Sequence, residues 1–160
     1  MTEHTERKFP FAASDKAFWA WACGLAALVA GLVLYWGNVQ FGGHDGSVLT
    51  IHAWQLHLGY KPYDELVSYL PPLFLIGSKL SYALWGVYWS SFVYTAALFG
   101  VATFLLQAFL LRRIGFGSFF SLFFAFVFEA LTIVSISWWW YNHTTALLAC
   151  LFLSAAYLLH

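Results

Sequence analysis

The sequence predicts an all-α integral membrane protein with about four transmembrane helices and two amphipathic juxtamembrane helices in its first external loop. Three observations lead to this fold class. Of the 160 residues, 62% are hydrophobic and 9% are charged, whereas soluble sequences carry about 25% charged residues, so a soluble globule could not be covered. The apolar residues gather in runs of membrane length. Most basic residues fall on one side when those runs are threaded through a bilayer.

The first membrane crossing is predicted at residues 17–36, an uncharged run that follows a polar segment at residues 1–16. This run is long enough to cross a hydrocarbon core of roughly 30 Å. It is longer than the apolar part of a signal peptide, and no A-x-A cleavage site follows it. We therefore expect a cytoplasmic segment at 1–16 and a membrane domain at 17–160.

Residues 37–90 are predicted to form an external loop with two surface helices. The first covers 46–58, where Val48, Ile51, Trp54 and Leu58 have helical spacing. Asp45 stands at its N-cap position, and Gly59 stands where a helix commonly ends. The second covers 71–86, which is short for a crossing and carries Lys79 in its middle.

The remaining crossings are predicted at 91–111, 116–136 and 144–160. With 71–86 on the surface, five basic residues are cytoplasmic, and only Lys61 and Lys79 are external. If 71–86 crossed instead, three would be inside and three outside. The positive-inside rule favours the first arrangement, with both termini cytoplasmic. The five cytoplasmic residues are Arg7, Lys8, Lys16, Arg112 and Arg113.

Charge and cysteine usage narrow the functional classes. The formal net charge of zero argues against a nucleic-acid partner, because phosphate binding needs clustered Lys and Arg. Cys23 and Cys150 lie inside apolar runs and match no metal or redox spacing. The loop histidines do not form the i, i+4 pair of a helical metal site, so we expect neither a metal nor a cofactor.

Two acidic residues stand out as candidates for chemistry. Asp45 lies among glycines just outside the first crossing, where it could cap a helix, meet a substrate, or do both. Glu129 lies in the outer half of the third crossing, where a charged carboxylate costs about 3 kcal/mol. It should therefore be protonated, paired or turned toward a polar cavity. A functional role and a packed structural role are both open.

A run of about forty-five residues resembles the N-terminal part of GT-C-fold glycosyltransferases, the polytopic enzymes related to protein mannosyltransferases and aminoarabinose transferases. In that family an acidic residue opens a surface helix after the first crossing, and a Gly-x-x-Pro-Tyr stretch and a Pro-Pro-Leu helix follow. This chain has Gly46 where many relatives carry Glu. The matching segments are Gly43-His44-Asp45-Gly46-Ser47, His52-Ala53-Trp54-Gln55-Leu56, Gly59-Tyr60-Lys61-Pro62-Tyr63-Asp64, Tyr69-Leu70-Pro71-Pro72-Leu73 and Leu84-Trp85-Gly86.

The resemblance implies inverting transfer of a sugar from a polyprenyl-phosphate donor to an acceptor at the external face of a bacterial inner (plasma) membrane. Asp45 would be the general base. Lys61 would stabilise the lipid-phosphate leaving group, although a lipid-headgroup contact explains it equally well. Trp140-Tyr141-Asn142 resembles the second external loop of some relatives. The substrate-binding residues expected are Lys61, His44, Glu129 and Asn142.

The alternative is a small non-catalytic subunit that packs into a larger membrane complex through its aromatic helices. Relatives of the GT-C type carry more membrane helices than this chain. We therefore expect membrane lipids as partners, together with another membrane subunit or a C-terminal continuation that completes the site. On this expectation the 160-residue chain is inactive in isolation.

Overall fold

The computed structural model describes residues 14–39, 43–65, 70–135 and 141–159 of the chain. These residues form helices joined by turns, so the expected all-helical fold class is confirmed. Each segment predicted to be helical contains a helix. The six are α1 (Ser14–Val39), α2 (Gly43–His57), α3 (Pro72–Trp85), α4 (Trp89–Arg113), α5 (Ser118–Ser135) and α6 (Tyr141–Leu159).

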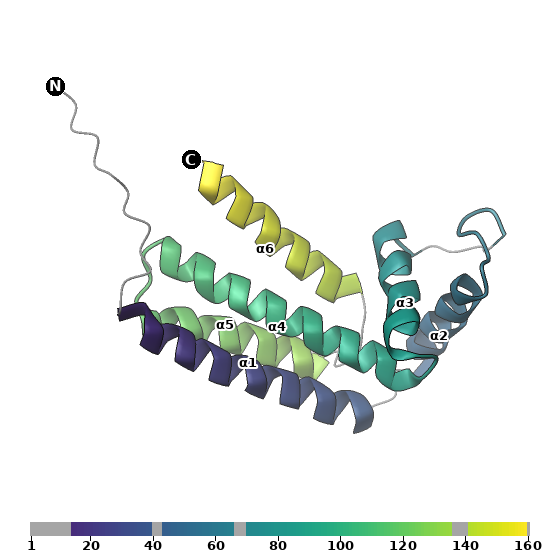
Figure 1. Ribbon diagram of the computed structural model, residues 1–160, viewed down its shortest axis with the longest axis horizontal. Coiled ribbons are helices and arrows are strands. Elements are labelled where there is room, and N and C mark those ends of the chain that lie inside the picture. The colour runs from purple at the N-terminus through teal and green to yellow at the C-terminus, as the bar shows by residue number, and fades with distance from the viewer. Residues whose placement is uncertain (1–13, 40–42, 66–69, 136–140, 160) are drawn as a thin grey trace.

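The four longer helices α1, α4, α5 and α6 form a bundle around α4. Helices α1, α5 and α6 each pack against α4, and α1 also packs against α5. Successive helices of the bundle run in opposite directions, so the described ends of the chain lie at the same end of the molecule (Figure 1). We call this the terminal end of the bundle and the opposite one the loop end.

Hydrogen bonds join the helices at both ends of the bundle. At the loop end, the indole Nε1 of Trp89 on α4 donates to the carbonyl oxygen of Gly37 on α1 at 3.0 Å. At the terminal end, the hydroxyl of Tyr157 on α6 donates to the carbonyl oxygen of Arg113 on α4 at 2.9 Å. Together they fix how α1 and α6 lie along α4.

Helix α4 occupies the centre, and its buried side chains combine small residues with aromatic rings. Its buried residues include Ala96, Gly100 and Ala108, which let neighbouring backbones approach closely, and Phe92 and Phe104, which are completely buried. The aromatic rings fill the space between the helices where the small residues leave it. This is the packing expected when helices associate in a bilayer through close contact.

Within the described residues, α1 and α4 are the two helices that are long and apolar enough to cross a membrane. They contain 26 and 25 residues. Helices α5 and α6 are shorter, with 18 and 19 residues, or about 27 and 28 Å at about 1.5 Å per residue. Crossing by α5 and α6 therefore remains a prediction.

Helices α2 and α3 form a separate pair at the loop end (Figure 1). Helix α2 packs against α3, and α3 packs against α4. Helix α3 begins with Pro72 at its first position and ends at Gly86, whose N–H bonds to the carbonyl of Tyr82 at 3.0 Å. It runs across the long direction of the bundle. We call this pair and the turn that follows α2, residues 58–65, the platform.

Helix α2 differs from the sequence expectation in two respects. It begins at Gly43, so Asp45 lies within its first turn and is not the N-cap. Glycine is tolerated there because the first N–H groups of a helix have no intrahelical partner. Helix α2 is also apolar on two faces. Leu49, Ala53 and Leu56 are buried, whereas Ile51, Trp54 and Leu58 of the predicted apolar stripe are exposed.

Candidate functional site

The platform is tied to the bundle by a series of aromatic contacts. The ring of His57 on α2 stacks on Trp54 and meets the edge of Tyr82 on α3, with centroids 6.2 Å apart in the second contact. Tyr82, which is buried, continues to Phe92 on α4 at 4.9 Å. A residue on α2 is therefore held in place relative to the bundle through packed rings.

Asp45 and His44 belong to the first turn of α2 by their backbone positions. Their side chains lie outside the described part of the structure. A carboxylate in the first turn of a helix is favoured by the N-terminal end of the helix dipole, by about 0.3–1 kcal/mol. The first turn of α2 is thus a favourable backbone position for an acidic residue.

Lys61 lies on the turn after α2, and its side chain is exposed. The backbone N–H of Lys61 donates to Oε2 of Glu65 at 2.9 Å. The turn is held further by the Tyr63 hydroxyl, which donates to the carbonyl of Leu70. Tyr63 has a φ of 69°, in the left-handed region. The cation of Lys61 therefore stands on an ordered turn.

Lys79, the second external cation, lies beside a cavity of about 250 Å³ between α2 and α3. Apart from the lysine and the Tyr60 hydroxyl, the lining is apolar. From the sequence, Lys61 was the residue expected to stabilise the lipid-phosphate leaving group. In the platform, however, Lys79 is the lysine that lies beside the apolar cavity. The cavity is lined by Leu56, Tyr60, Pro62, Pro72, Leu75, Ile76 and Lys79.

Two residues of α2 with buried hydrogen-bond acceptors were not identified as site residues from the sequence. Nδ1 of His52 lies 2.7 Å from the carbonyl oxygen of Val48, which makes Nδ1 the donor and leaves Nε2 as an acceptor. Nε2 of His52 and Oε1 of Gln55 are both buried without a partner among the described residues. Both residues lie within the segments that resemble GT-C enzymes, and this resemblance is the sequence signal that could have identified them.

Glu129 is 3% exposed on α5 and faces the interior of the bundle. A Cβ placed on Gly100 of α4 would lie 3.7 Å from its Oε2 and 3.7 Å from Val29 of α1. A Cβ at Gly100 would thus make ordinary van der Waals contacts, and the carboxyl group of Glu129 lies against this part of α4. Oε1 is buried with no hydrogen-bond partner among the described residues.

A second polar contact lies near Glu129. The thiol of Cys150 on α6 is within hydrogen-bonding reach of the Gln107 side chain on α4. Cys150 itself is buried. Helices α4, α5 and α6 therefore each contribute a polar side chain to an otherwise apolar bundle.

The expected site residues fall into two groups. Asp45, His44 and Lys61 belong to the platform, whereas Glu129 belongs to the bundle, where α5 packs on α1 and α4. Asn142 lies in the first turn of α6, and its side chain is outside the described residues. In the part of the chain that is described, no three His, Cys, Asp or Glu residues come together in a group that could hold a metal ion.

Comparison with family models, with curated proteins and with solved structures gave no match to this chain.

Proposed function

We propose that the chain is a GT-C-like glycosyltransferase module embedded in a bacterial inner membrane, with four crossings and cytoplasmic termini. The alternating directions of α1, α4, α5 and α6 support this topology (Figure 1). So does the charge distribution, because Lys16, Arg112 and Arg113 lie at the terminal end. In this orientation the platform lies at the external face.

The observation that carries the proposal is that the segments resembling GT-C enzymes fold into one unit. Those within the described residues occupy α2, the turn after it, α3 and its C-terminal glycine. Exposed Ile51 and Trp54 on α2, followed by exposed Leu58 in the turn after it, suit insertion into the lipid interface, since the opposite face of α2 is already packed on α3. Asp45 would then stand at the boundary between lipid and water.

The proposed reaction is a direct displacement at the anomeric carbon of a polyprenyl-phosphate sugar. The acceptor hydroxyl oxygen forms the new glycosidic bond while the bond to the phosphate oxygen breaks. Asp45 takes the acceptor proton, and the polyprenyl phosphate leaves with the electron pair. A cation near the departing phosphate lowers the barrier, and Lys61 and Lys79 are the candidates on the platform.

The test compares Asp45→Asn with Asp64→Asn in membranes that contain the chain. Transfer is followed as release of polyprenyl phosphate from a labelled polyprenyl-phosphate sugar. Asp45→Asn should lower turnover at least a hundredfold, since loss of a general base costs about 10²–10⁴ in rate. Asp64 is an exposed carboxylate on the same platform, so Asp64→Asn should change turnover less than twofold. Equal turnover by the wild-type and Asp45→Asn chains would reject Asp45 as the base.

A non-catalytic subunit is the second candidate, and the exposed aromatic side chains of α5 are the observation that favours it. Phe120, Phe124 and Phe128 are exposed on this helix and suit packing against a helix of another chain. Purification of the native assembly separates the two candidates. A constant companion polypeptide that cross-links at Phe124→Cys, together with no transfer by the assembly, would support the subunit role.

A further inference from the structure

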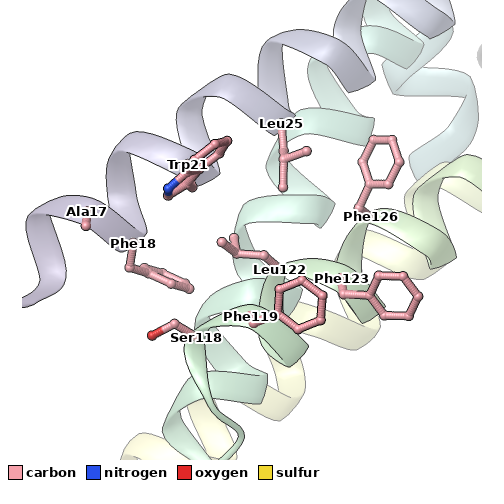
Figure 2. Close-up of a pocket in the computed structure, with 9 residues that line it drawn as sticks. All are labelled: Ala17, Phe18, Trp21, Leu25, Ser118, Phe119, Leu122, Phe123 and Phe126. Carbon is pink, nitrogen blue, oxygen red and sulfur yellow. The ribbon is translucent and has the colours of Figure 1, made fainter.

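The junction of α3 with the start of α4 buries hydroxyl groups. By contrast, the space between α1 and α5 is lined almost entirely by apolar side chains (Figure 2). At the junction, α3 buries Ser78 and Ser81, and the first two turns of α4 bury Ser91 and Thr95. A buried hydroxyl group needs a hydrogen-bond partner. The partners of these four groups therefore show how the two helices are joined.

The two serines of α3 donate to carbonyl groups of their own helix. The hydroxyl of Ser78 donates to the carbonyl oxygen of Phe74 at 2.9 Å. The hydroxyl of Ser81 donates to the carbonyl oxygen of Gly77 at 2.8 Å. Both donors are therefore satisfied within α3, whatever the position of α4. The oxygen of each serine can still accept a hydrogen bond from another group.

Thr95 makes the bond that crosses the junction. Its hydroxyl lies 2.7 Å from Oγ of Ser81 on α3 and 2.9 Å from the carbonyl oxygen of Ser91 on α4. Because Ser81 donates its own proton to Gly77, its oxygen accepts the proton of Thr95. The bond therefore joins a side chain of the platform to a side chain of the bundle.

This bond and the corner at Gly86 together fix the angle between α3 and α4. Ser81 lies more than one turn before the corner, and Thr95 lies more than one turn into α4. Two helices joined only at a corner can swing about it, whereas a second attachment away from the corner removes that freedom. The rings of Tyr82 and Phe92 also meet here, but apolar contact is not directional. The hydrogen bond supplies the direction.

The angle between α3 and α4 decides where Asp45 lies relative to the bundle. Asp45 belongs to α2, and α2 packs on α3 (Figure 1). A bundle that spans the bilayer has a fixed depth in it, and the phosphate of a polyprenyl-phosphate donor lies at the level of the lipid headgroups. A change in the angle would therefore move Asp45 relative to the sugar of the donor.

We propose that Ser81 and Thr95 are positioning residues for sugar transfer, because their hydrogen bond holds the platform at the angle at which Asp45 reaches the donor. This inference rests on the proposed function. Both side chains are buried, so they act through Asp45 and do not contact the substrate. A misplacement of about 1 Å in an active site can lower the rate about a hundredfold.

The activity test compares variants of the full chain in membranes. Thr95→Val keeps the size of the side chain, removes the hydroxyl and should lower kcat about a hundredfold. Thr95→Ser keeps the hydroxyl and should retain turnover. Ser81→Ala should repeat the effect of Thr95→Val, and the double variant should add nothing, because either change removes the same bond. Ser78→Ala is the control, since it removes a buried hydroxyl that bonds within α3, and its turnover should stay at the wild-type level.

A distance measurement tests the angle without sugar transfer. Nitroxide labels are placed at Tyr60→Cys on the platform and Leu28→Cys on α1, both of which are 48% exposed, after Cys23 and Cys150 are replaced by alanine. Double electron–electron resonance then gives the distribution of distances between the labels. Thr95→Val should shift or broaden this distribution, whereas Thr95→Ser and the control Ser78→Ala should leave it as in the wild type.

The two readouts separate this proposal from the proposed function. Unchanged distances in Thr95→Val would overturn the positioning role, whatever the activity. Changed distances with wild-type turnover would also overturn it, as would equal effects of Thr95→Val and Ser78→Ala. If the wild type itself transfers no sugar, the proposed function fails, and a distance change confined to Thr95→Val and Ser81→Ala would still support this bond as the attachment that sets the platform angle.

Discussion

At the scale of single residues, Glu129 shows what the sequence can predict and what it cannot. Its place in an apolar run predicted a buried carboxyl group that needs a partner or a cavity. Gly100, which lies beside its carboxyl group, comes from α4, so no spacing along α5 could have identified it. The surroundings of Lys79 could not be predicted from the sequence either, because the cavity beside it forms only where α2 packs on α3.

Replacing Glu129 by methionine should stabilise the isolated chain. Oε1 of Glu129 is buried without a partner among the described residues, and leaving such an atom unsatisfied costs about 1–3 kcal/mol. Thermal unfolding in detergent should therefore shift upward in Glu129→Met. Leu131→Met, at a site 66% exposed on the same helix, is the control and should leave the melting temperature unchanged. A lower melting temperature for Glu129→Met would mean that the carboxyl group holds the bundle together.

At the scale of helices, the sequence predicts well where helices occur. It predicts poorly which face of a helix is buried. A helix in each segment was predicted by the length of the apolar run and by the positions of prolines and glycines. The predicted stripe of α2, with Ile51 and Trp54, is exposed, whereas Leu49 and Ala53 pack on α3. A helix that is apolar on two faces gives no single period-3.6 stripe, so periodicity alone could not tell which face meets α3.

The corner between α3 and α4 depends on Gly86, which gives a second stability prediction. Gly86 has φ 88° and ψ 173°, a region open essentially to glycine alone. A Cβ there would also lie 3.0 Å from Cε2 of Tyr88. Gly86→Ala should therefore destabilise the chain by about 1–3 kcal/mol.

Gly31→Ala is the matched control, because it lies within α1 and its Cβ would meet nothing within 4 Å. Alanine in a helix interior is favoured over glycine by about 1 kcal/mol, so this variant should melt at or above the wild-type temperature. Unfolding in detergent, followed by far-UV circular dichroism, measures both. If Gly86→Ala melted as Gly31→Ala does, the corner would not depend on glycine.

At the scale of the whole molecule, one arrangement accounts for the charges and the topology together. Hydrogen bonds from Trp89 and Tyr157 hold α1 and α6 along α4 at opposite ends. Lys16 and Arg112 lie at the terminal end, and the platform with Lys61 and Lys79 lies at the other. The proposed catalytic face and the basic residues of the terminal end therefore lie at opposite ends of the bundle.

The measurement that tests this arrangement most directly is cysteine labelling in intact cells with a membrane-impermeant maleimide. Cys23 and Cys150 are first replaced by alanine. Single cysteines then replace Tyr60, which is 48% exposed on the platform, and Gly117, around which a Cβ has open space. Leu28→Cys, in the middle of α1, is the control for a position facing lipid. The account predicts that Tyr60→Cys is labelled in intact cells, Gly117→Cys only after permeabilisation, and Leu28→Cys in neither case. Labelling of Gly117→Cys in intact cells would contradict the four-crossing topology and the placement of the platform outside.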